Sequence, residues 1–186
     1  MPINHPPLEP LLGYIEGDGA IPPLEDWHPP LSGEMDLCIR ADGRWWHEGE
    51  PIARGRLVRL LSTILRREDD GVHYLITPVE KWRIAVEDCA FLIVDADHQD
   101  GVWTLTTNVG DRLTLDGDHR LSLDQDIPSV PVRFGLAARL HRNVYYRLVE
   151  QAESRTVNED GAPQQELGIE SAGVWQPLGR FSEEGT

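Results

Sequence analysis

Cysteine is scarce in this chain. Only two occur among 186 residues, Cys38 and Cys89, and no C-x-x-C pair is present. Zinc ribbons and dithiol redox sites need cysteines paired at short spacing, so both classes of site are excluded. Because each cysteine lies in an apolar, strand-like segment, we expect both thiols to be buried.

Positive charge is also in short supply. Lysine and arginine number 17 against 32 aspartates and glutamates, which gives a formal net charge of -15 at pH 7. This charge repels the phosphate backbone and anionic lipid, so we expect neither nucleic acid nor a membrane as a partner. A small anion is not excluded, because a local cluster of arginine and lysine can dominate the field of a cleft.

Long apolar runs are missing. No segment approaches the ~20 apolar residues that span a bilayer, and the first residues lack the basic start and apolar stretch of a secretion signal. We therefore expect a cytoplasmic protein. A hydrophobic content of 40% is enough for a packed core, and the length falls between one domain and two small ones.

Catalytic and metal-binding motifs are absent or incomplete. No glycine-rich phosphate loop occurs, and the seven histidines form no H-x-H or H-E-x-x-H group. The acidic turn at 95–100 is one residue too long for a calcium loop. "GIESAG" (168–173) lacks the first glycine of a nucleophile elbow, so Ser171 is expected to be a strand residue. We predict no cofactor and no metal, and we nominate no catalytic residue.

Turn signals are frequent. Asp-Gly occurs six times, beginning at positions 18, 42, 70, 100, 116 and 160, and this dipeptide favours tight hairpin turns. Short alternating or apolar runs lie between these turns, which is typical of antiparallel sheet. The polar segment "ESRTVNEDGAPQQE" (153–166) is expected to be a mobile loop.

Two segments show helical periodicity instead. In residues 54–67, "RGRLVRLLSTILRR", apolar side chains recur at helical spacing and arginines occupy the remaining face. Residues 142–152, "RNVYYRLVEQA", carry a similar but shorter apolar stripe. We predict a helix over each segment.

The two predicted helices lie in similar surroundings. "ARGRLVRLL" matches "HRNVYYRLV", and in both places a strand, a glycine turn and a second strand precede the helix and a strand follows it. We predict an α+β fold of two similar small domains, built from a duplicated strand-turn-strand-helix-strand unit with mainly antiparallel sheets. The domains are expected at 34–89 and 90–186, after a proline-rich strap at 1–33 that Trp27 anchors.

The stretch "TPVEK" (77–81) places an acid beside a base between two strand-like runs. Pro78 restricts the backbone, which fixes the directions of Thr77 and Glu80. Two interpretations stay open. In one, Glu80 and Lys81 contact a ligand; in the other, the segment is a rigid turn in which Glu80 pairs with Lys81 or a nearby arginine.

The chain resembles the bacterial DUF1285 family, proteins of unknown function, from about Ile21 to Gly179. The resemblance is carried by "IPPLEDWHPPLSGEMDLCIRADGRWWHEGEPIAR", "LVRLLSTILRRE", "YLITPVEKWRIAVED", "TTNVGD" and "VPVRFGLAARLHRNVYYRLVE". It implies a duplicated α+β core, a C-terminal half like a pleckstrin-homology fold, a nucleotide-like ligand between the halves, and a role in signal transduction. The family has no established catalytic residues to transfer.

These observations favour a non-catalytic ligand-binding or regulatory protein over two alternatives. One is a protein-interaction module without a small ligand, which recruits a partner through a surface sheet or a basic helix, and the other is an uncharacterised hydrolase. Domain junctions are common sites for small ligands, so we predict a cleft between the two halves. Its expected ligand-binding residues supply two cations, a hydroxyl, a carboxylate and an amide: Arg54, Lys81, Thr77, Glu80 and Asn108.

Overall fold

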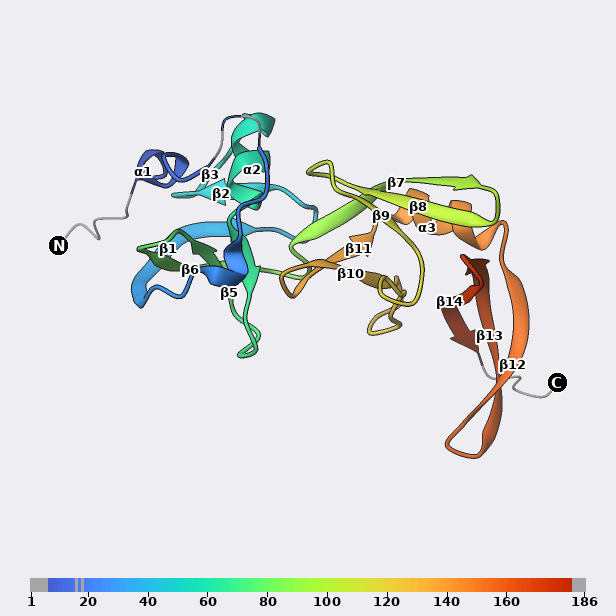
Figure 1. The fold of residues 1–186 in the computed structure, drawn as a ribbon. Helices are drawn as coiled ribbons and strands as arrows, with labels where there is room; N and C mark the ends of the chain where they lie inside the picture. The colour runs from blue at the N-terminus through green and yellow to red at the C-terminus, as the bar shows by residue number, and fades with distance from the viewer. Residues whose placement is uncertain (1–6, 16, 18, 182–186) are drawn as a thin grey trace. The chain divides into compact units, whose positions relative to one another are not determined.

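The computed structural model describes residues 7–15, 17 and 19–181, which divide into two units. The first unit ends at Ala90 and also includes residues 133–136; the remaining described residues from Phe91 on form the second. Strands dominate both units and the helices are short (Figure 1). No helix in the described residues is long and apolar enough to cross a membrane. The sheet-rich architecture agrees with the predicted α+β class.

In its described part, the first unit has one sheet, with strand order β3-β2-β1-β6-β5-β4. Neighbouring strands are antiparallel except β1 and β6, which are parallel. Side chains alternate along β1, so Met35, Leu37 and Ile39 enter the core. The elements are α1 (Glu9–Leu12), η1 (Leu24–Asp26), β1 (Leu31–Ile39), β2 (Trp45–His47), β3 (Glu50–Pro51), α2 (Gly55–Ser62), β4 (Leu65–Arg67), β5 (His73–Ile76) and β6 (Lys81–Val86).

Helix α2 is shorter than the periodicity predicts. It ends at Ser62, where the hydroxyls of Ser62 and Thr63 donate to the carbonyls of Arg59 and Leu60. The chain then turns, and Leu65 pairs with Leu75 of the neighbouring strand β5. The prediction of a helix through residue 67 is wrong because an apolar run packs equally well as a helix turn or as a short buried strand.

The N-terminal strap contains short helical turns and is anchored by a different residue than predicted. Leu24 is fully buried, whereas the Trp27 side chain is half-exposed. The guanidinium of Arg66 donates to the carbonyls of Leu24 at 2.6 Å and Trp27 at 3.1 Å. The strap is therefore held by the buried Leu24 side chain and by hydrogen bonds from the Arg66 guanidinium to its backbone carbonyls. Residues 1–6, 16 and 18 of the predicted strap lie outside the described residues.

In its described part, the second unit has two sheets, with strand orders β10-β11-β7-β8-β9 and β12-β13-β14. Strand β7 pairs with β11 in parallel, whereas the pairs β7–β8, β8–β9, β12–β13 and β13–β14 are antiparallel. Helix α3 is amphipathic: Val144 and Leu148 are buried, and the Tyr145 hydroxyl donates to the Leu178 carbonyl. The elements are β7 (Phe91–Gln99), β8 (Val102–Thr107), β9 (Arg112–Thr114), β10 (Ser129–Arg133), β11 (Leu136–Leu140), α3 (Arg142–Val149), β12 (Glu153–Glu159), β13 (Ala162–Ser171) and β14 (Val174–Phe181).

The segment 153–166 is a β-hairpin and not a loop. Strands β12 and β13 pair in continuous register from Glu153 with Gly168 to Glu159 with Ala162. The turn is Asp160-Gly161, and both residues have positive φ, as a two-residue hairpin turn requires. The prediction of a loop is wrong. It was based on the polar composition of the segment, whereas the Asp160-Gly161 dipeptide between the two strands is a hairpin turn signal.

Ser171 ends β13, as predicted. Its side chain is fully buried; the hydroxyl accepts from the Trp103 N–H at 2.8 Å and donates to the Leu115 carbonyl at 2.7 Å. With both hydrogen-bonding roles filled by backbone, Ser171 is structural.

The two cysteines are less buried than predicted. Both are half-buried, and neither forms a disulfide. Burial and the negative charge of Glu87 raise the pKa of the Cys38 thiol. Cys38 therefore stays protonated at neutral pH and is a poor nucleophile.

The buried carboxylate of Glu166 connects side chains of all three strands in the sheet β12-β13-β14. Glu166 accepts from the Trp175 indole N–H at 2.7 Å and from the guanidinium groups of Arg155 and Arg180. Burial alone would raise the Glu166 pKa, but these hydrogen bonds lower it below its ordinary value. The indole is thereby fixed over Gly168.

Gly168→Ala is expected to destabilise the protein by about 1–3 kcal/mol, since an added Cβ would lie 2.5 Å from the fixed Trp175 ring and 2.6 Å from the Gln176 carbonyl oxygen. Urea denaturation measures the change. Gly117→Ala is the control, because nothing lies within 4 Å of its added Cβ. Equal stability of the two variants would show that the sheet can move aside to admit a methyl group.

Candidate functional site

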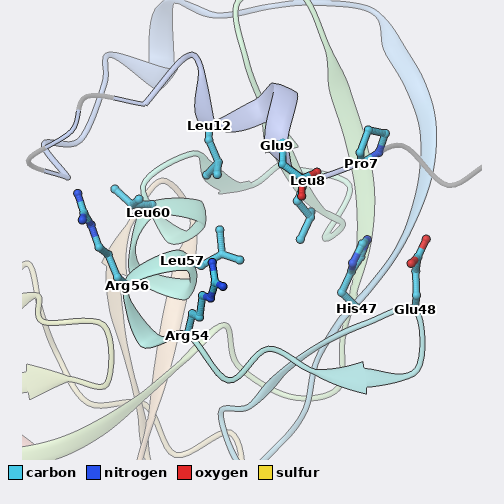
Figure 2. Close-up of a pocket in the computed structure, with 10 residues that line it drawn as sticks. All are labelled: Pro7, Leu8, Glu9, Leu12, His47, Glu48, Arg54, Arg56, Leu57 and Leu60. Carbon is cyan, nitrogen blue, oxygen red and sulfur yellow. The ribbon is translucent and has the colours of Figure 1, made fainter.

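A pocket of about 540 Å³ opens on the first unit between α1, α2 and the turn that follows β2 (Figure 2). This volume is within the range that accepts small organic ligands. Among the described residues that line it, five are leucine or proline, four are charged, and one is histidine: Pro7, Leu8, Leu12, Leu57, Leu60, Glu9, Glu48, Arg54, Arg56 and His47.

Leucines from both helices form the apolar wall of the pocket. Leu8 and Leu12 are one helical turn apart, and Leu57 and Leu60 are three residues apart on α2, so each pair shares a face. Figure 2 shows the two pairs turned toward one another. Leu8 is buried, whereas the other three are half-exposed. The wall therefore retains apolar surface that a ligand can cover.

Arg54 supplies a cation at this wall. It is the N-cap residue of α2, its backbone is extended, and its side chain lies beside Leu57 (Figure 2). Among the described residues, its guanidinium makes no hydrogen bond or ion pair. The first turn of α2 contains no acidic residue that would compensate this charge. Arg54 is thus available to an anion.

Four other described residues with polar or charged side chains line the pocket. The Nε2 atom of His47 is buried and has no hydrogen-bond partner in the described part of the chain. Arg56 donates to the Gly17 carbonyl at 3.3 Å. Glu9 and Glu48 are exposed, and among the described residues neither forms an ion pair with Arg54 or Arg56. The described lining therefore carries two positive and two negative formal charges that are not paired with one another.

The "TPVEK" segment is a rigid turn between β5 and β6. Thr77 is fully buried; its N–H donates to the Glu80 carbonyl, and its hydroxyl oxygen accepts from the N–H of Val79 at 3.3 Å and of Glu80 at 3.0 Å. The Thr77 side chain thus caps the turn by hydrogen bonding to its backbone. Its hydroxyl oxygen already accepts two hydrogen bonds from backbone N–H groups.

Lys81 pairs with Glu68 and not with its neighbour Glu80. The ammonium lies 3.0 Å from the Glu68 carboxylate and above the Tyr74 ring, while Arg66 holds the other Glu68 oxygen at 2.7 Å. Burial alone would raise the Glu68 pKa, but hydrogen bonds from Arg66 and Lys81 lower it below its ordinary value of 4.5. The charge of Lys81 is therefore compensated within the first unit.

The five predicted ligand residues fall in three places. Thr77, Glu80 and Lys81 belong to one turn, and Arg54 lines the pocket that none of those three lines. Asn108 belongs to the second unit, where its side-chain oxygen accepts from the Leu92 N–H at 3.0 Å.

The pocket residues that sequence reasoning missed are mainly the leucines of α1 and His47. Leu8 and Leu12 lie in a proline-rich segment, which conceals their helical spacing of four. His47 carries no motif. Within the described residues, no group of three or more His, Cys, Asp and Glu is placed to hold a metal ion.

Two family descriptions match consecutive parts of the chain. "Domain of unknown function (DUF1285), N-terminal domain" matches residues 22–89, and "Protein of unknown function (DUF1285), C-terminal domain" matches residues 90–178. The chain belongs to the DUF1285 family. This confirms the resemblance found in the sequence. No curated protein matches the chain.

Two solved DUF1285 structures are similar to this member. A DUF1285 family protein from Silicibacter pomeroyi DSS-3 is 37% identical, with 92% of this chain and 94% of that chain covered and a TM-score of 0.78. A DUF1285 family protein from Shewanella baltica OS155 is 30% identical, with 62% of this chain and 91% of that chain covered and a TM-score of 0.53.

Thr77→Val is expected to cost about 1 kcal/mol of unfolding free energy, because two partly buried N–H groups of the turn lose their acceptor while the side-chain shape is kept. Thr77→Ser keeps the hydroxyl and should retain most of that stability. Chemical denaturation of both variants measures the difference. The reverse order, with serine the less stable, would assign the role of Thr77 to methyl packing.

Glu68→Gln is expected to destabilise the protein at pH 7 by about 1–2 kcal/mol, through loss of two charge-assisted hydrogen bonds. A carboxyl with a lowered folded pKa stabilises above its unfolded pKa of 4.5, and this contribution is lost as pH falls through the folded pKa. Denaturation as a function of pH should therefore show wild type and variant converging below 4.5.

The matched control for this experiment is Glu34→Gln, which breaks an exposed pair with Arg83. Its effect should be a few tenths of a kcal/mol at pH 7. A Glu68→Gln variant that stays less stable by the same amount at all pH values would show that the side-chain charge is unimportant.

Proposed function

We propose that this DUF1285 protein is a non-catalytic ligand-binding regulatory protein, and that the pocket between α1 and α2 receives a small anion. The observation that carries the proposal is the guanidinium of Arg54, which is without a protein partner in the described residues and stands beside a leucine-lined pocket. A planar guanidinium binds carboxylate and phosphate through paired hydrogen bonds. Occupancy of such a site transmits a signal when the ligand stabilises one conformation over another.

The finer expectations about architecture belong to the same proposal. Residues 129–159 run strand, turn, strand, helix, strand, and residues 31–67 follow the same order with one additional two-residue strand, β3, before the helix, which supports a duplicated unit. The likeness of residues 90–186 to a pleckstrin-homology fold, the cytoplasmic location and the role in signal transduction stay predictions. So does the nucleotide-like ligand between the two halves.

Thermal denaturation with inorganic phosphate, AMP and octanoate tests the proposal. A ligand at about a hundred times its dissociation constant adds roughly 2.7 kcal/mol to stability, which raises the melting temperature. We expect Arg54→Ala to reduce the shift. Arg59→Ala, an exposed arginine on the same helix that does not line the pocket, should leave it unchanged.

Two outcomes would contradict this proposal. If none of the three probes raises the melting temperature, the anion-binding role is wrong. If Lys81→Ala abolishes a shift that Arg54→Ala leaves intact, the ligand binds at the turn that the sequence suggested. Turnover of phosphoesters, thioesters or peptides by the purified protein would in turn favour the hydrolase alternative.

A further inference from the structure

We infer that the ligand of the α1–α2 pocket is a carboxylate attached to an unbranched apolar chain, such as a medium-chain fatty acid. The carboxylate pairs with Arg54, and the chain lies along the leucines of the two helices. This inference rests on the proposed function and narrows it to one chemical class. Three features of the pocket lead to it.

The first feature is the kind of apolar surface. None of the described residues that line the pocket is tryptophan, tyrosine or phenylalanine, so a base or other flat ring has no such side chain to stack on there. The wall is instead built from aliphatic side chains, and Leu12, Leu57 and Leu60 are half-exposed. Covering that surface with methylene groups removes apolar area on both partners from water.

The second feature is the charge balance. Among the described residues, two arginines and two glutamates line the pocket, and Arg56 already donates to the Gly17 carbonyl. A phosphate that carries two or more charges would meet Glu9 and Glu48 in a protein whose net charge is -15. A carboxylate carries one charge, which the single guanidinium of Arg54 matches in geometry as well as in sign.

The third feature is an unsatisfied hydrogen-bonding atom. His47 Nε2 is buried and has no partner in the described part of the chain, an arrangement that costs stability unless another group completes it. His47 lines the pocket, and Figure 2 shows its ring pointing toward α1. Because Nε2 is buried, the ring must first turn toward the pocket; in the tautomer that protonates Nε2, this atom would then donate to a ligand oxygen.

Isothermal titration of the full-length protein with four probes tests the inference. Octanoate has both head and chain, octanol keeps the chain without the charge, acetate keeps the charge without the chain, and AMP represents nucleotides. Octanoate should bind at least tenfold more tightly than each of the others. Arg54→Ala should weaken octanoate about tenfold and leave octanol unchanged, whereas Leu57→Ser should weaken both. Arg59→Ala is the matched control.

Each departure from this pattern has a defined meaning. AMP binding more tightly than octanoate, with loss on Arg54→Ala, overturns the acyl carboxylate while the anion-binding function stands. Octanol binding as tightly as octanoate shows that Arg54 does not recognise the head group, which overturns the inference. Binding of none of the four overturns both this inference and the proposed function. Melting curves of the variants without ligand establish that each is folded.

Discussion

Arg66 is the residue on which the first unit depends most. Its guanidinium reaches the carbonyls of Leu24 and Trp27 in the strap and, on its other side, the carboxylate of Glu68. Glu68 in turn holds Lys81 at the start of β6. One cation on a three-residue strand thus connects the strap, the sheet edge and the β5–β6 turn. Because Arg66 is largely buried, these bonds are poorly screened and hold the parts in one arrangement.

This connection explains why an acid and a base stand side by side in the turn. Glu80 and Lys81 are neighbours in sequence, yet the alternation of a strand directs them apart, and Lys81 reaches back across the hairpin to Glu68. The turn itself is fixed by the Thr77 hydroxyl and not by either charge. The conformation of the turn therefore depends on hydrogen bonds to its backbone, and of the two charged residues Lys81 takes part in the ion pairs of Glu68.

Local turn chemistry was the most predictable part of the fold. Asp100-Gly101 and Asp160-Gly161 both close hairpins with positive φ at each residue, as the dipeptide requires. Hydrophobic periodicity was less informative. Leu65 fits the apolar stripe of a helix as well as a short buried strand, and its pairing with Leu75 in the structure shows that it belongs to a strand. Polarity misled in the segment 153–166, since a hairpin with exposed strands needs few apolar residues to form.

The candidate site was predictable only in part, as a comparison of Arg54 with Lys81 shows. Arg54 and Lys81 were both expected to bind an anion from charge and position. Whether a cation is available depends on a carboxylate that tertiary structure brings to it: Glu68 lies thirteen positions from Lys81 and meets it across a hairpin, while Arg54 meets no such group among the described residues. The pocket beside Arg54 needs the leucines of α1, which are distant in sequence. Whether a lysine or arginine forms an ion pair depends on the tertiary structure. An unpaired cation such as Arg54 can therefore be identified only after the ion pairs of the fold are known.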